Sequence, residues 1–343
     1  MNVRGEKLEL SHRRAIIVGA GQAGLAVSAE LVLRGLIPQR DFVVIDRAPG
    51  TRSWASRWHS MRLLSEARHS ALLPHPFPGD PRRHPRVNEM ASYLTAFEKH
   101  IGLTPCWGLQ VTGVRRVGNG MTLELRTHAG DVQTRNVVCA TGAHARPHVP
   151  AWSSDLTVPG TVLHSSQYQY PRQIPAGDVL IVGGGNAGVQ LARELLASHR
   201  VTLATRTPRR RRPAAAYPAM SGDRQRRFTG ERVPEPLFTD SYAELREAGV
   251  DIAPAAVGAI GAEVVLSDGR QLCPTSVVFA TGYRPGDEWL PDDVRAHPGK
   301  RGRTSMPGLF TAGLPRYGYP GGDTIQGVLR DAARVARHII QRP

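Results

Sequence analysis

Glycine recurs in two places at a spacing suited to phosphate binding. The two motifs are GAGQAG at residues 19–24 and GGGNAG at residues 183–188. In such a turn the first glycine permits a sharp bend, the second admits a pyrophosphate against the backbone, and the third lets helix and strand pack closely. Two copies indicate two dinucleotide sites more specifically than one copy would. The alternative is a tight turn that merely opens an ordinary helix.

The residues that follow the next predicted strand differ between the two copies. In the first copy the strand at 42–45 ends in Asp46, where a carboxylate can bond a ribose hydroxyl. The second copy has Arg206 at that place, followed by four arginines at 209–212. Arginine accommodates a 2′-phosphate through charge-assisted hydrogen bonds, so we expect NADP(H) rather than NAD(H) there. For residues 209–212 a solvated basic loop is the alternative.

Each glycine turn lies between an apolar run and a stretch with apolar residues at helical spacing, which predicts strand, turn and helix. Two further apolar runs, VVCATG at 137–142 and VVFATG at 277–282, bracket the second copy. We therefore expect an α/β fold of two Rossmann-like dinucleotide-binding domains, one inserted into the other. The expected parts are residues 1–150 and 275–343 for the outer domain and 151–274 for the inserted domain. A last helix, capped by Asp323, is expected to follow.

Composition and charge limit the partners. The chain has 343 residues, is 41% hydrophobic and carries a net charge of +15. Without a nucleic-acid-binding signature, this charge favours anionic cofactors or substrates over nucleic acid. No apolar run approaches the ~20 residues of a membrane span, and the N-terminus lacks a signal-peptide core, so we expect a cytoplasmic protein with no membrane partner. A homodimer stays open.

Neither thiol pairs nor metal ligands are predicted. The cysteines lie far apart in the sequence, as Cys106, Cys139 and Cys273. A flavin disulfide reductase needs a paired thiol, so this class is disfavoured. Three histidines of a Pro-rich stretch, His69, His75 and His84, lack the spacing of metal ligands.

Other segments resemble the class B flavin-dependent monooxygenases, in particular the compact bacterial relatives of the flavin-containing monooxygenases and the YUCCA-type enzymes. They are RWHSMRLLSEARHSALLPHPFPGD at residues 57–80 and the pattern G-x-x-x-H-S-S-x-Y from Gly160 to Tyr168. Both glycine turns and both ATG segments are part of the same resemblance. The resemblance runs from about Arg14 to Ile340. Val158 departs from it, because the family has an aromatic residue there.

The resemblance implies FAD on the first turn, NADPH on the second, and a small-molecule substrate and O₂ as reactants. It implies a flavin C4a-hydroperoxide that transfers one oxygen atom to the substrate. An NADPH-dependent flavin oxidase or an electron-transfer reductase is the alternative enzyme, and a flavin-bound redox sensor with a basic surface is the non-enzymatic alternative. Ser65 and Asn186 are candidates for holding the oxygenated flavin or the nicotinamide. Glu66 is either an acid/base group or a surface carboxylate paired with an arginine.

The expected cofactor contacts follow from the turns and from the resemblance. For FAD they are Gly19, Gly21, Gln22, Ala23, Gly24, Asp46, Arg47, Trp54, Arg62, Leu63, Val111, Ala140, Thr141, Gly142, Gly313, Thr324 and Gln326. For NADP they are Gly183, Gly185, Asn186, Ala187, Gly188, Arg206, Arg209, Ala280, Thr281 and Gly282. Trp54, Trp58, His59 and Arg62 could wall a flat aromatic ligand, or the tryptophans could simply cover the core. Leu314 stands where many flavoproteins have an aspartate, which leaves the ribityl contact unassigned.

Overall fold

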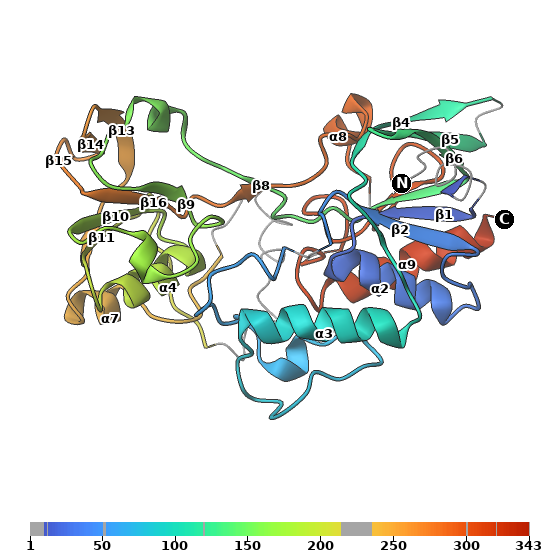
Figure 1. Cartoon of the computed structure of the whole chain (residues 1–343), viewed down its shortest axis with the longest axis horizontal. Coiled ribbons are helices and arrows are strands. Elements are labelled where there is room, and N and C mark those ends of the chain that lie inside the picture. The colour runs from blue at the N-terminus through green and yellow to red at the C-terminus, as the bar shows by residue number, and fades with distance from the viewer. Residues whose placement is uncertain are drawn as a thin grey trace.

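The computed structural model describes residues 10–11, 13–50, 53–118, 121–213, 235–299, 301–319 and 321–342. The chain forms two lobes, each built on a five-stranded parallel sheet (Figure 1). A short antiparallel ribbon of β8 (Arg146–Pro147) and β17 (Tyr283–Arg284) joins them. In the described part of the chain, no helix has the length and apolar character that crossing a membrane requires.

The sheet of the first lobe has the order β18-β7-β1-β2-β3. Its strands are β1 (Ala15–Val18), β2 (Phe42–Asp46), β3 (Cys106–Trp107), β7 (Asn136–Cys139) and β18 (Leu309–Thr311). Every side chain of β1 and β7 is buried, as expected of parallel strands covered on both faces. Helices cover one face, namely α2 (Gln22–Val32), α3 (Val87–His100) and α9 (Val328–Gln341), and an antiparallel sheet covers the other, namely β4 (Val111–Val117), β5 (Thr122–Thr127) and β6 (Gly130–Thr134).

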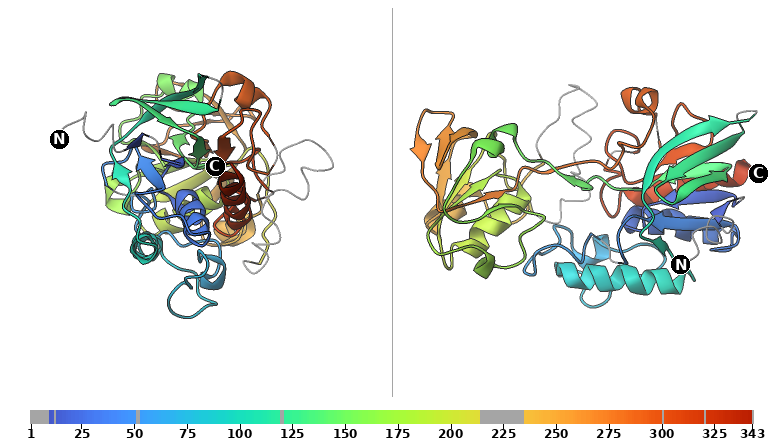
Figure 2. Two further views of the ribbon diagram at one scale, coloured as in Figure 1. Left: turned by 90° about the vertical axis from the view of Figure 1, so that its right-hand side faces the viewer. Right: turned by 45° about the horizontal axis from the view of Figure 1, so that its top comes forward.

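The second lobe repeats this layering, with the sheet order β12-β11-β10-β16-β9. Its strands are β9 (Val162–His164), β10 (Asp178–Val182), β11 (Arg200–Ala204), β12 (Asp251–Ala253) and β16 (Ser276–Phe279). One face carries α4 (Asn186–Leu195) and α7 (Tyr242–Glu247), and the other carries the antiparallel β13 (Ala256–Ile260), β14 (Glu263–Leu266) and β15 (Gln271–Leu272). Figure 2 shows the two lobes and their layers from further directions. The predicted fold class is confirmed.

The boundary expected between residues 274 and 275 is corrected by the pairing of β16. This strand lies between β10 and β9 in the second sheet, just as β7 lies between β1 and β18 in the first. The second ATG segment therefore ends a strand of the inserted lobe, and the chain crosses back only at β17. A strand that enters a parallel sheet beside the strand of the glycine turn belongs to that nucleotide unit.

The last helix begins later than expected. Its first residue is Val328 and its N-cap is Gly327, so Asp323 does not cap it. The Thr324 hydroxyl accepts a hydrogen bond from the Gly327 amide at 3.0 Å, within a run of turns. The remaining short helices are η1 (Ala67–His69), η2 (Ala151–Asp155), η3 (Pro171–Gln173) and α8 (Asp292–Ala296).

Residues 53–63 form a strap that runs from the first lobe to the second (Figure 1). Trp58 is only 3% exposed and belongs to the hydrophobic core of the second lobe. The His59 amide donates to the Gln169 carbonyl at 3.0 Å. Trp54 instead packs against the core of the first lobe. The tryptophans therefore cover two cores, and Trp58 does not line a ligand site.

Candidate functional site

The first glycines of the two turns have the same geometry. Their φ angles are +114° at Gly19 and +118° at Gly183, in the region that favours glycine. A Cβ atom would lie 2.4 Å from the Ala140 carbonyl oxygen in the first turn and 2.4 Å from the Ala280 carbonyl oxygen in the second. The ATG segments therefore touch the glycine turns.

The third glycines hold helix and turn together. A Cβ atom on Gly24 would lie 1.9 Å from the Gly19 carbonyl oxygen, and one on Gly188 would lie 1.9 Å from the Gly183 carbonyl oxygen. Helices α2 and α4 thus begin directly on the turns. Their first amide groups lack intrahelical partners and face the turn, which is the arrangement of an anion-binding helix terminus.

The second glycines differ, and the difference involves Arg209. Among the described residues, no neighbouring atom lies within 4 Å of the position of a Cβ atom on Gly21, so the backbone there is open to a ligand. The corresponding position on Gly185 lies 3.3 Å from Nη1 of Arg209. The same nitrogen donates to the Glu235 carbonyl at 3.1 Å. The first turn is an open cradle, whereas the second already has a guanidinium beside it.

Asp46 is fixed beside the first turn. Its carboxylate accepts hydrogen bonds from the amides of Ala20 at 2.7 Å and Ala48 at 2.8 Å. A pocket opens next to it, lined by five of the predicted FAD residues, Gly19, Asp46, Arg47, Val111 and Thr141. Sequence analysis missed the other lining residues, Val18, Leu109, Gln110, Ala145, Gly286, Glu288 and Trp289.

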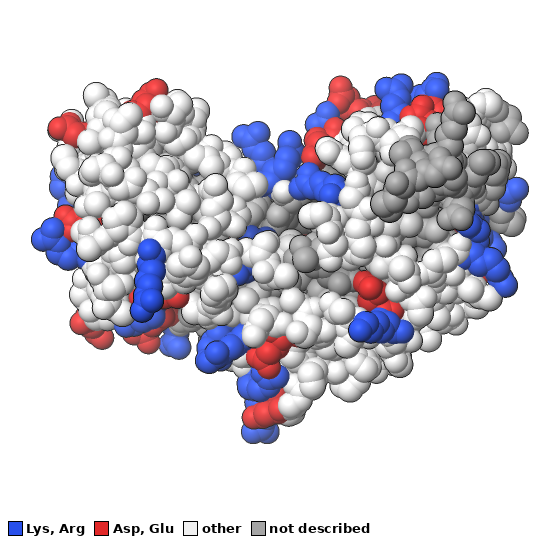
Figure 3. All heavy atoms as spheres, in the orientation of Figure 1, with Lys and Arg blue, Asp and Glu red and all other residues white. Residues whose placement is uncertain are grey.

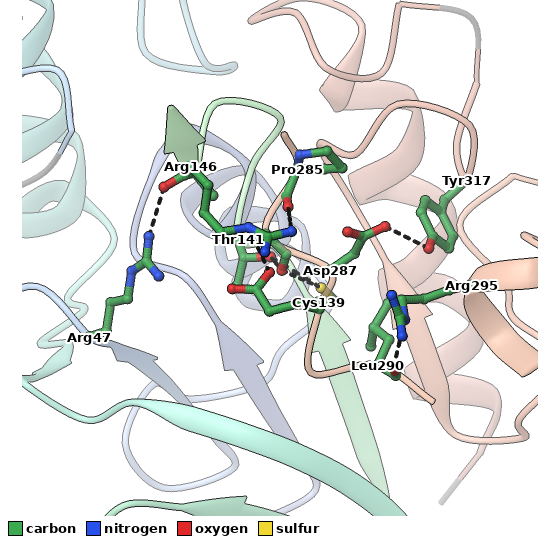
Figure 4. A network of polar contacts seen from close by, with 12 residues as sticks. Arg47, Cys139, Thr141, Arg146, Pro285, Asp287, Leu290, Arg295 and Tyr317 are labelled. Atoms are coloured by element: carbon green, nitrogen blue, oxygen red, sulfur yellow. Dashed lines mark hydrogen bonds and ion pairs between the residues drawn. The ribbon is translucent and has the colours of Figure 1, made fainter. Parts of the chain in front are cut away.

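Gly286, Glu288 and Trp289 follow β17 on the return crossing, and Ala145 lies just before β8. Figure 4 shows polar contacts between these two segments of the chain. Arg47 donates to the Ala145 carbonyl at 2.9 Å, and the Thr141 hydroxyl donates to the Gly286 carbonyl. In the second lobe the Thr281 hydroxyl likewise donates to the His148 carbonyl. Each ATG threonine thus ties its turn to the opposite strand of the crossing.

Further predicted FAD residues gather at the start of α2. The Trp54 indole donates to the Gln22 side chain at 3.1 Å. Gly313 has φ +72°, and a Cβ atom on it would lie 2.4 Å from the Cβ atom of Ala23. Gln326 bonds the His69 ring at 2.9 Å. The C-terminal segment therefore does close against the first turn.

Two predicted FAD residues lie apart from this group. Arg62 is exposed, its side chain donates to the His84 carbonyl at 3.4 Å, and its amide donates to Gln190 of α4 at 3.4 Å. Leu63 is buried in the core of the first lobe. Arg62 therefore contacts the second lobe through Gln190, whereas Leu63 packs in the first lobe.

Two of the catalytic candidates, Ser65 and Glu66, have partners within the protein. The Ser65 hydroxyl is buried and bonds the Ser70 hydroxyl at 2.8 Å. Glu66 forms an ion pair with Arg68 at 2.6 Å. The Ser65 hydroxyl is thus bonded inside the protein. The ion pair of Glu66 agrees with one of its two alternatives, a carboxylate paired with an arginine.

Asn186, the third catalytic candidate, is bonded to residues 235–238. Its amide nitrogen donates to the Glu235 carboxylate at 3.2 Å and to the Pro236 carbonyl at 3.0 Å, and its oxygen accepts from the Phe238 amide at 3.0 Å. Burial raises the pKa of Glu235 above its usual value. The Asn186 side chain therefore holds residues 235–238 against α4.

The basic segment 206–212 is ordered by the same neighbours. Arg206 follows the end of β11 and is exposed. The Leu237 amide donates to the Arg210 carbonyl at 3.0 Å, and the Arg212 amide donates to the Leu237 carbonyl at 2.8 Å. The Arg211 guanidinium donates to the Thr239 carbonyl at 2.6 Å. The segment is thus a paired strip beside the second turn and not a free loop.

The histidine of the Gly160–Tyr168 motif lies at the crossing between the lobes. His164 bonds the Ser166 hydroxyl at 2.9 Å and the Gly282 carbonyl at 3.0 Å. Its ring meets Tyr283 edge-on at 4.9 Å, and Arg57 of the strap lies over the same tyrosine at 4.7 Å. Burial lowers the pKa of His164, which favours the neutral ring. The motif thus joins strap and crossing.

Positive charge is spread over the surface and not confined to one lobe. Figure 3 shows Lys and Arg side chains on both lobes and in the notch between them, with fewer acidic side chains. Within the described residues no group of three His, Cys, Asp or Glu side chains could hold a metal ion.

The two glycine turns agree with a comparison of the sequence with known protein families. Residues 16–313 match the family model described as pyridine nucleotide-disulphide oxidoreductase. The chain belongs to this family.

Similar proteins refine the placement within the family. The uncharacterized oxidoreductase CzcO of Bacillus subtilis is 27% identical, over 94% of this chain and 98% of its own length. The indole-3-pyruvate monooxygenase YUCCA1 of rice is 31% identical over 53% of this chain and 44% of its own length. The flavin-containing monooxygenase of Stenotrophomonas maltophilia superposes with a TM-score of 0.78 at 25% identity, covering 95% of this chain and 98% of that one. The expected kinship with the class B flavin monooxygenases is confirmed.

Proposed function

We propose that this chain is an FAD-dependent NADPH:oxygen monooxygenase that acts on a small-molecule substrate. The observation that carries the proposal is the pair of glycine turns with matching geometry, one in each lobe, at Gly19 and Gly183. The names of the flavin monooxygenases that the chain resembles support the choice of reaction.

The first turn fits the pyrophosphate of FAD, because the open position on Gly21 and the start of α2 form a cradle for it. Asp46 would bond the adenosine ribose. When bound, FAD would supply hydride acceptance from NADPH and the activation of O₂. The indole of Trp54 and the backbone of Gly313, both packed on the start of α2, would limit where the flavin can lie.

The second turn fits NADPH, with separate roles for two arginines. Arg209 already lies over Gly185, where the pyrophosphate approaches, so its guanidinium would bind that group. Arg206 stands exposed after β11, where the 2′-phosphate of NADPH would lie. The strap and the crossing would fix the distance between the two turns, because the Trp58 side chain is buried in the core of the second lobe.

The cysteines do not support a disulfide reductase. All three are free. Cys139 is buried, and burial raises the pKa of its thiol to about 12, so it stays protonated and unreactive at neutral pH.

A flavin oxidase is the second candidate, because the Ser65 and Glu66 side chains are both bonded within the protein and offer no free polar group to an oxygenated flavin.

Anaerobic reduction followed by mixing with O₂ tests the proposal. The FAD-loaded protein is reduced with NADPH or NADH, then mixed with O₂ and a thioether, an amine or a cyclic ketone. We expect faster reduction by NADPH and oxygenated product in proportion to NADPH consumed. Hydrogen peroxide in place of product with every substrate indicates the oxidase. Protein that takes up no flavin would overturn both candidates.

A further inference from the structure

A hollow on the outer face of α9 is lined mainly by cations. Its volume is about 370 Å³, and its lining residues are Tyr319, Arg330, Ala333, Arg334 and Arg337. This volume lies within the range of small-molecule sites, roughly 300–1,000 Å³. Helix α9 packs beside α2 at the edge of the first lobe, far along the chain from both glycine turns (Figure 2).

The helical period brings the three arginines together. Arg330, Arg334 and Arg337 recur at spacings of four and three and so share one face. The opposite face is buried and includes Val328, Ala332, Val335 and Ile339. Ala333 lies between the arginines, and its small side chain leaves the hollow between them unfilled.

Among the described residues, no carboxylate pairs with the arginines of this face. In the part of the chain that the structure describes, none of the three arginines takes part in an ion pair. Asp331 is the only acidic residue of α9, and it is buried, where it accepts a hydrogen bond from the Tyr319 amide at 2.7 Å. Like charges at these spacings destabilise a helix, so the face is suited to an anion.

One polar atom of a lining residue has no hydrogen-bond partner among the described residues. Nε of Arg334 is buried, and it has no hydrogen-bond acceptor among the described residues. Nη1 of the same guanidinium reaches the Tyr319 hydroxyl at 3.5 Å. The Arg301 guanidinium lies 5.9 Å from the centre of the Tyr319 ring and adds positive charge at the rim. A buried donor of this kind calls for a ligand or an ordered water.

We propose that this hollow binds the phosphate group of a small phosphorylated molecule, at a site separate from both glycine turns. Guanidinium groups match phosphate oxygens with two parallel hydrogen bonds. A phosphate group offers three terminal oxygens and up to two charges, enough to serve several guanidinium groups at once. The single pair of oxygens of a carboxylate cannot do so.

Calorimetric titration of the full-length protein, loaded with FAD and saturated with NADP⁺ so that both glycine turns are occupied, with inorganic pyrophosphate at fixed ionic strength tests this site. The variants are Arg334→Gln and the double variant Arg330→Gln/Arg337→Gln, whose replaced side chains are exposed. The control is Arg172→Gln, an exposed arginine of η3 in the other lobe. We expect the Kd for pyrophosphate to rise at least about tenfold in both α9 variants, as for loss of a charge-assisted hydrogen bond, and to stay unchanged in the control.

Three outcomes would overturn the site. Equal affinity in wild type and α9 variants would place the anion elsewhere, such as at a glycine turn. An equal loss in Arg172→Gln would show a general effect of net charge. Tighter binding of a single-stranded oligonucleotide, steeply weakened by salt and lost in the α9 variants, would make the face a polyanion surface. FAD content and reduction by NADPH, measured in the same variants, report separately on the proposed function.

Discussion

Trp54 and Trp58, neighbours in one strap, belong to the cores of different lobes. The Trp54 indole is bonded to Gln22 at the start of α2, whereas Trp58 is buried in the core below the second sheet. The strap therefore links the start of the first nucleotide-binding helix to the interior of the other lobe.

Removing the buried side chain of Trp58, which anchors the strap, should destabilise the second lobe. Trp58→Ala is expected to lower the free energy of unfolding by about 3–5 kcal/mol, because it empties a large buried site. Urea unfolding followed by circular dichroism measures this. Trp58→Phe keeps most of the volume and serves as the control. A cost below about 1 kcal/mol for the alanine variant would mean that Trp58 is not an anchor.

Substitutions in the two glycine turns should impair different cofactors. Gly19→Ala places a Cβ atom against the Ala140 carbonyl and should abolish FAD uptake. Gly183→Ala makes the same clash with the Ala280 carbonyl, and we expect it to keep FAD while losing reduction by NADPH. Flavin absorbance and anaerobic reduction rates measure the two effects. Loss of FAD in both variants would contradict the assignment of separate nucleotides.

Arg206 and Arg209 should affect the two nicotinamide cofactors differently. Arg206→Ala is expected to weaken NADPH about 10–100-fold and leave NADH unchanged, because only NADPH has the 2′-phosphate. Arg209→Ala should weaken both by a similar factor, because both carry the pyrophosphate. Arg210→Ala, at an exposed neighbour in the same strip, is the control. The measurement is KM for each cofactor; a change confined to NADPH in Arg209→Ala would reassign that side chain to the 2′-phosphate.

Asp331 should make stability fall as pH rises. Burial, opposed by a hydrogen bond from the Tyr319 amide and reinforced by the charge of Asp323, raises its pKa to about 7. Between roughly pH 4 and pH 7 the unfolded chain has released this proton while the folded protein keeps it, so the carboxyl's contribution is complete at low pH and lost as pH approaches 7. The loss amounts to a few kcal/mol.

The variant Asp331→Asn isolates this effect. It keeps the acceptor for the Tyr319 amide and cannot titrate. Unfolding free energies of wild type and variant, measured from pH 4.5 to 7.5, should diverge with rising pH in favour of the variant. Parallel curves would show that Asp331 does not titrate in this range.

Glu66 should be dispensable for catalysis. Its carboxylate is paired with Arg68, so Glu66→Gln is expected to change kcat less than about twofold and to shift stability by less than about 1 kcal/mol. Steady-state oxidation of NADPH across pH measures this. A loss of a hundredfold or more, or of one limb of the pH profile, would restore Glu66 as an acid/base group.

Features that are local in the chain could be predicted from the sequence. The turns at Gly19 and Gly183, the strands before them and the helices after them follow from glycine's freedom at positive φ and from apolar periodicity, which act over a few residues. The contact of the ATG segments with the turns, by contrast, was seen only in the structure. The end of the inserted lobe could not be predicted either, because β16 reads as the same apolar run whichever sheet it joins.

Roles that depend on distant neighbours could be decided only by the tertiary structure. Asn186 has the right type and place for a cofactor contact, yet its amide is used by residues 235–238. Trp58 looks like part of a ligand wall until its burial in the other lobe is known. The sequence by itself determined the backbone geometry of two phosphate cradles, because backbone torsion is a local property. Which side chains remain free to act there was decided by packing and hydrogen bonding between segments far apart in the chain.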